Sequence, residues 1–87
     1  WESLLERGLR AAGQSEQAAR KQNKSEEWKI WIAREMKRRS NAPNAWIAKR
    51  LHMGVPQAVT VYIGRFEKET KLSSPAYAAF VENFKTG

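Results

Sequence analysis

Residues 46–66 read WIAKRLHMGVPQAVTVYIGRF, and this stretch decides the expected fold of the chain. Its first part has apolar residues at helical spacing and ends at Leu51, after which His52-Met53-Gly54 forms a corner. Pro56 then suits the first position of a second amphipathic helix, where its missing N–H breaks no hydrogen bond. The stretch therefore predicts a helix-turn-helix, the arrangement that places its second helix in the DNA major groove.

Small residues in and after the first helix favour this arrangement. Ala48 stands between the expected core residues Ile47 and Leu51, where the second helix must cross closely. The compact form of the motif has glycine directly after this leucine, but here that position is His52 and the glycine comes two residues later. We therefore expect a turn with one extra residue, in which Gly54 takes a positive φ, as glycine does most easily.

The expected second helix has two faces when its residues are placed at intervals of about 100°. Val55, Val59, Ile63 and Phe66 fall on one face and are predicted to be buried, with Tyr62 at its border. The candidate DNA-contacting residues lie in the first turn and on the other face: Pro56, Gln57, Thr60, Val61, Gly64, Arg65 and Lys68. A solvent-exposed helix face without a ligand remains the alternative interpretation.

Three of these candidates have side chains suited to reading base edges. The Gln57 amide can pair with adenine through two hydrogen bonds, and Thr60 offers both a hydroxyl and a methyl that can meet a thymine methyl. Gly64 would permit close approach of the helix backbone.

The net charge of +7 is concentrated in one segment of the chain. Residues 23–51 carry eight basic and three acidic side chains and so hold +5 of it. Basic clusters neutralise backbone phosphates and release counterions, which makes nucleic acid the expected partner. The candidate phosphate contacts are Lys37, Arg38, Arg39, Lys49 and Arg50. For each of them, a surface cation without a ligand is an equally good interpretation.

The remaining sequence also has helical spacing, so we expect an all-α fold of five or six short helices. In the supporting part, residues 1–39, Gly13 should end the first helix, Ser15 should cap a second through Lys21, and Ser25 should cap a third. The expected buried residues of this part are Trp1, Leu4, Leu5, Leu9, Ala18, Ala19, Trp28, Trp31, Ile32 and Met36.

The helix-turn-helix itself should span residues 43–68, with Pro43 at the first helical position and Trp46 facing inward. A polar loop follows, and a terminal helix over residues 75–85 should begin at Ser74-Pro75. Its apolar side is predicted to be Tyr77, Phe80, Val81 and Phe84.

Length and composition exclude several classes of protein. Eighty-seven residues suffice for one domain, and an apolar content of 41% excludes a disordered chain. Without cysteine there is no disulfide framework or thiolate zinc site, so we expect no metal and no cofactor. No apolar run has the length of a membrane span and no signal peptide is visible, so we expect a cytoplasmic, nucleoid-associated protein. Since the chain opens on Trp1, we expect it to be a piece of something longer.

Other functional interpretations of single residues are weaker. His52 is a lone histidine without cysteine or neighbouring carboxylates, which favours a turn residue over a ligand or catalyst. Tyr62 and Tyr77 lie among apolar residues, so packing is favoured over a role as nucleophile, and no catalytic residue is expected. Trp28, Trp31 and Trp46 could form a stacking platform for single strands, but their helical spacing favours the core.

From Leu5 to Phe66 the chain resembles the C-terminal region of bacterial REP-associated tyrosine transposases. The resemblance rests on ERGLRAAG at 6–13, KIWIAREM at 29–36 and above all WIAKRLHMG at 46–54, followed by Val59. In that family a separate N-terminal domain carries a histidine-pair metal site and a nicking tyrosine. With one histidine, this chain lacks that pair, so the resemblance implies a DNA-recognition part rather than an enzyme. The Ser40–Pro43 link departs from the family, and residues 70–87 fall outside the resemblance.

Three functions follow from these observations. The first is the element-recognition domain of such a transposase, bound to duplex DNA or to a palindromic hairpin. The second is a helix-turn-helix transcriptional regulator of the same fold. The third is a protein-interaction module, in which the Tyr77–Phe84 helix docks on a partner or on a second copy of the chain.

Overall fold

Six α-helices form the framework of the computed structural model, which describes residues 1–69 and 71–86. They are α1 (Glu2–Ala12), α2 (Glu16–Lys21), α3 (Glu27–Arg39), α4 (Asn44–Leu51), α5 (Pro56–Lys68) and α6 (Pro75–Thr86), with a 3-10 turn η1 (Lys71–Ser73) between the last two. No strand occurs in these ranges, and the predicted all-α class is confirmed.

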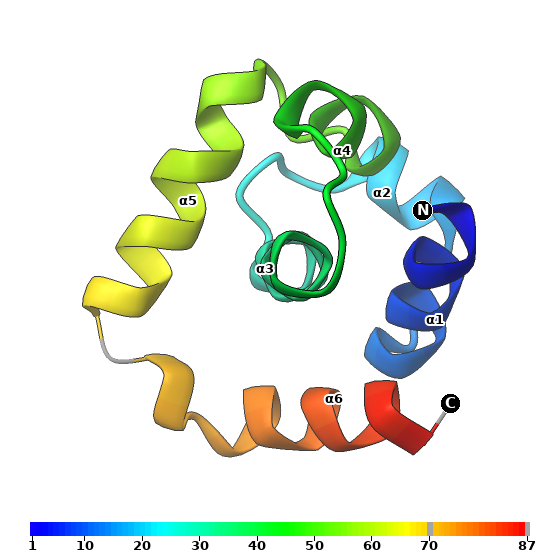
Figure 1. Cartoon of the computed structure of the whole chain (residues 1–87), viewed down its shortest axis with the longest axis vertical. Coiled ribbons are helices and arrows are strands. Elements are labelled where there is room, and N and C mark those ends of the chain that lie inside the picture. Colours follow the sequence, from blue (N-terminus) through cyan, green and yellow to red (C-terminus); the bar gives the residue numbers. More distant parts are fainter. Residues whose placement is uncertain (70, 87) are drawn as a thin grey trace.

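Helix α3 runs through the middle of the molecule and the other helices surround it (Figure 1). Helices α4 and α5 pack against each other at one end, and α1 and α6 pack together on the far side. Met36, Ile32 and Ala33 of α3 are fully buried at the centre. The buried residues that close around them from the other elements are Leu5, Leu9, Ala19, Ile47, Ala48, Leu51, Met53, Val59, Phe66, Tyr77, Phe80 and Phe84.

Helix α1 approaches α3 closely at Gly8. A Cβ atom at this position would stand 2.8 Å from Cγ2 of Ile32, which is shorter than any ordinary carbon contact. Glycine is therefore required by packing here, although it costs helix stability relative to alanine.

Two charged side chains of α3, Lys29 and Glu35, are completely buried. The Lys29 ammonium donates hydrogen bonds to the backbone oxygens of Ala19 at 2.6 Å, Gln22 at 3.1 Å and His52 at 3.3 Å. These carbonyls lie at the C-terminal ends of α2 and α4, where the helix dipole favours a cation. Burial lowers the pKa of Lys29, but each of the three ammonium protons has an acceptor. Lys29 thus joins three helices.

The Glu35 carboxylate accepts three hydrogen bonds on the side of α3 that faces α6. Arg39 donates at 2.9 Å, Arg38 at 3.1 Å and the Tyr77 hydroxyl of α6 at 2.9 Å. Burial raises the pKa of Glu35, but the hydrogen bonds from Arg39 and Tyr77 and the charge of Arg38 more than offset burial, so the pKa lies below its usual value. Tyr77 is therefore a core residue that fixes α6 to α3, as its apolar surroundings in the sequence indicated.

Several predicted helix boundaries are confirmed, whereas Leu4, Ala18, Trp31 and Ile63, which were predicted to be buried, are only half-buried. Gly13 ends α1 with a φ of 67°, the Ser15 hydroxyl accepts a hydrogen bond from the Ala18 N–H at the start of α2, and Pro56 opens α5. The Ser74 hydroxyl likewise accepts from the N–H of Tyr77, as expected for a helix beginning at Ser74-Pro75.

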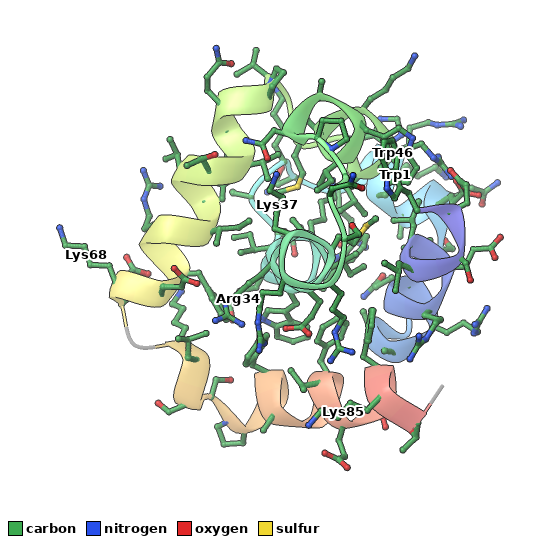
Figure 2. All side chains as sticks on the ribbon, viewed as in Figure 1. Trp1, Arg34, Lys37, Trp46, Lys68 and Lys85 are labelled. Atoms are coloured by element: carbon green, nitrogen blue, oxygen red, sulfur yellow. The ribbon has the colours of Figure 1, made fainter. Side chains whose placement is uncertain are left out.

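Other predictions are wrong. Val55 is 62% exposed, because it precedes α5 in extended backbone and does not share the helical face of Val59. The third helix is capped at Glu26, not Ser25, and Pro43 precedes the first turn of α4 instead of entering it. Trp1 is 48% exposed; its ring meets the half-buried Trp46 edge to face at 5.5 Å, outside the core (Figure 2).

Replacing Lys29 with methionine should destabilise the fold by roughly 2–4 kcal/mol, because three carbonyls would lose their donor while the side-chain volume is largely kept. Urea unfolding followed by circular dichroism measures this. Lys21→Met removes an exposed lysine from α2 and is the matched control, expected to stay within about 0.5 kcal/mol of the parent. Equal effects of the two substitutions would contradict the role of Lys29.

Glu35 should contribute to acid unfolding. Its folded-state pKa is lower than the unfolded value, so its stabilisation is complete above the unfolded pKa and is lost as the pH falls through the folded one. At pH 7, Glu35→Gln should therefore be less stable than the parent by about 1–3 kcal/mol. Urea unfolding at successive pH values should show this difference shrinking below about pH 4.5, the ordinary carboxyl range. A difference that stays constant down to pH 2 would refute this account.

Candidate nucleic-acid interface

Helix α5 exposes one complete face to solvent. Val59 and Phe66 are buried beneath it, with Tyr62 and Ile63 half-buried along its sides. All seven candidate residues of this segment are exposed: Pro56, Gln57, Thr60, Val61, Gly64, Arg65 and Lys68. Lys68 projects away from the body of the molecule, at the outer edge of α5 (Figure 2). We call these residues the α5 face.

The α5 face carries no negative charge. The one carboxylate in the sequence of α5, Glu67, is exposed and borders this face, where it lines a hollow with Thr60 and Gly64; it accepts a hydrogen bond from Arg34 at 2.8 Å, which balances its charge. Arg65 and Lys68 are the charged members of the face, and no acidic partner contacts either of them among the described residues. Apart from the Glu67 carboxylate, which is paired with Arg34, a polyanion meets only neutral and basic groups on this surface.

Thr60 is already engaged within the protein. The Asn44 amide of α4 donates a hydrogen bond to the Thr60 hydroxyl oxygen at 2.8 Å. The Thr60 methyl and hydroxyl proton stay accessible, since the residue is exposed. This contact ties the first turn of α4 to the middle of α5.

Gly64 has no structural explanation within the fold. A Cβ atom there would meet nothing within 4 Å, in contrast to Gly8, where one would collide with Ile32. Glycine in the interior of an exposed helix costs about 1 kcal/mol relative to alanine. Gly64 also has no positive φ that would demand glycine.

The corner between α4 and α5 has two residues with positive φ. Gly54, with a φ of 96°, adopts the conformation predicted for it. His52, with a φ of 54°, also lies in the left-handed region and ends α4, a conformation that was predicted only for Gly54. A Cβ on Gly54 would stand 3.2 Å from Cδ of Lys24, so glycine also makes room for that lysine. His52 therefore serves as a turn residue.

The predicted phosphate contacts divide into paired and unpaired cations. Arg50 binds Glu2 through two hydrogen bonds of 2.7 and 2.9 Å and Glu16 at 2.7 Å, and these hydrogen bonds raise its pKa. Arg38 and Arg39 bind the buried Glu35. These three arginines are engaged in joining helices or in holding a buried carboxylate.

The other two predicted contacts differ from these arginines. Lys37 donates to the backbone oxygen of Ala42 at 3.2 Å and remains exposed. Figure 2 shows it between α3 and α4. Lys49 is exposed and forms no ion pair with any residue that the structure describes.

Two further cations lie near Lys49, and neither is among the predicted phosphate contacts. Arg20 of α2 and Lys24 of the loop after it line the same open hollow as Lys49 and His52, with a volume of about 870 Å³. Local spacing contains no signal for this grouping, because the tertiary fold brings residues 20–25 beside residues 48–54.

The described residues contain no group of three or more side chains that could hold a metal ion. No helix of the described part is long and apolar enough to cross a membrane. Comparison of the chain with protein-family models, with curated proteins and with solved structures finds no match.

Proposed function

We propose that this chain is a DNA-binding domain in which α5 enters the major groove. The observation that carries this proposal is the α5 face, which is exposed, has no acidic member, is bordered by one carboxylate that Arg34 neutralises, and is backed by a buried opposite face. An α-helix fits the major groove, and the N-terminal residues of such a helix reach base edges. In this arrangement α4 and the corner hold the angle of α5, with Lys49 and Lys37 near the phosphates.

The class of DNA target follows from the resemblance to REP-associated tyrosine transposases. The most specific part of that resemblance, WIAKRLHMG, spans α4 and the corner that position α5. We therefore propose the element-recognition part of such a transposase, with duplex or palindromic hairpin DNA as ligand and no chemical step of its own. A helix-turn-helix transcriptional regulator uses the same surface in the same way.

A role as a protein-interaction module has less support. That hypothesis needs the apolar side of α6 to be free for a partner or a second copy of the chain. Tyr77, Phe80 and Phe84 are instead buried within the protein, where α6 packs against α1 and η1. Docking through this helix would require it to leave the core.

The proposal predicts sequence-dependent and salt-dependent DNA binding. Fluorescence anisotropy with labelled palindrome-containing duplex and hairpin DNA should show the logarithm of the affinity falling linearly with the logarithm of salt concentration. Gln57→Ala should reduce discrimination at one base pair by about 1–3 kcal/mol. Lys49→Ala should weaken all sequences alike, because a phosphate contact carries no sequence information.

Glu82→Ala on α6 is the control and should leave discrimination unchanged, since Glu82 is exposed in the C-terminal half of that helix, whose end lies beside α1 and away from α5 (Figure 1). The proposal is wrong if the parent chain shows no measurable affinity for either DNA at low salt.

Gly64→Ala should separate stability from binding. Alanine should stabilise the fold by up to about 1 kcal/mol, since the added methyl meets no neighbour and alanine favours the helix. The same methyl should weaken DNA binding several-fold if the backbone of α5 lies close to base edges. Thermal unfolding and anisotropy together measure both effects.

Ala79→Val, which adds bulk at an exposed position of α6, should not alter DNA affinity. Undiminished binding by Gly64→Ala would show that this part of α5 stays clear of the groove.

A further inference from the structure

The hollow beside the α4–α5 corner is lined by cationic and neutral groups alone. Arg20, Lys24 and Lys49 contribute positive charge from α2, the α2–α3 loop and α4, and His52 adds an imidazole. No carboxylate lines it. Tyr62 of α5 forms the side nearest to the α5 face, so the hollow and that face are adjacent. We call it the corner hollow.

The cations of the corner hollow are available to a ligand. None of Arg20, Lys24 and Lys49 forms an ion pair within the described parts of the chain, and all three are exposed. Arg38, Arg39 and Arg50 in contrast have carboxylate partners. Of the predicted phosphate contacts, Lys37 and Lys49 have no carboxylate partner among the described residues, and the corner hollow adds Arg20 and Lys24 to Lys49.

A neutral side chain in the corner hollow, Gln22, adds a hydrogen-bond donor. The indole N–H of Trp28 donates to the Gln22 side-chain oxygen at 2.8 Å, which occupies one lone pair of that oxygen, while the NH₂ group of the same amide is a donor that bonds to no described residue. Donors and cations together favour an anion over a cation or an apolar ligand.

The buried Lys29 removes the negative charge that this region would otherwise have. The corner hollow lies where α2 and α4 both end, and helix C-termini carry partial negative charge on their free carbonyls. The ammonium of Lys29 binds the backbone oxygens of Gln22 and His52, which are both lining residues. The positive charge of Lys29 thus offsets the partial negative charge of these carbonyls, so an anion in the corner hollow meets no repulsion from the two helix ends.

We propose that the corner hollow binds a backbone phosphate of the nucleic-acid strand that borders the groove occupied by α5. This inference rests on the proposed function and adds a second contact surface to it. The ligand is a strand rather than a small ion because the hollow is open, holds about 870 Å³ and continues to α5 at Tyr62. Lys24 is central, since its side chain crosses the corner over Gly54.

The test measures DNA affinity of the full chain across a salt series for Lys24→Gln and Arg20→Gln. Each should weaken binding to every sequence about 3- to 10-fold near 0.1 M salt and lower the salt slope by roughly one, the value for one lost phosphate contact. Lys85→Gln and Arg10→Gln make the same change in net charge on α6 and α1 and should match the parent; Figure 2 shows Lys85 at the edge opposite α4. Lys24→Arg should retain the slope.

The outcomes separate this inference from the proposed function. If the parent binds DNA and Gln57→Ala loses discrimination, but the corner-hollow variants behave like Lys85→Gln, the inference is wrong and the α5 proposal stands. If the parent binds no DNA, both are wrong. Unchanged thermal midpoints of Lys24→Gln and Arg20→Gln would assign their loss of affinity to the contact itself.

Discussion

The ammonium group of Lys29 is the interaction on which the arrangement of helices depends. It is buried in α3, yet its three acceptors belong to the ends of α2 and α4. Burying the Lys29 ammonium without hydrogen bonds would be very costly, and without this ammonium the carbonyls at the ends of α2 and α4 would lack a donor. The three hydrogen bonds meet both needs. Because α4 and its corner set the position of α5, a polar contact at the centre of the molecule determines where the exposed helix face points.

Local sequence signals predicted the helices well. The helices begin and end as predicted at Gly13, Ser15 and Pro56, where glycine, serine and proline have their usual roles at helix ends. From Val59 onward, the buried and exposed sides of α5 also follow the helical period. Val55 was misassigned because the period was extended one residue beyond the start of the helix. These signals depend only on residues within a few positions of one another, so they can be recognised in the sequence without a structure.

Long-range pairings of charge were not predictable in the same way. Arg50 looked like a phosphate contact from its place beside Lys49, but the fold brings Glu2 and Glu16 to it. Lys29 and Glu35 look like ordinary exposed residues of an amphipathic helix, and both are buried because partners arrive from distant segments. Counting charges along the chain located the basic segment, while only the tertiary structure distinguishes its engaged from its accessible cations.

The two sides of α5 leave room for evolutionary change. Val59 and Phe66 are buried and fix the helix to the core, whereas the side chains of Gln57 and Val61 form no hydrogen bond or core contact with the described residues, so their replacement carries little packing cost. Descendants of one ancestral sequence could exchange these residues and acquire different ligands without having to rebuild the fold. Thr60 is the exception, since its bond to Asn44 couples any exchange there to α4. Divergence on this surface would therefore proceed through single substitutions at some positions and through paired ones at Thr60.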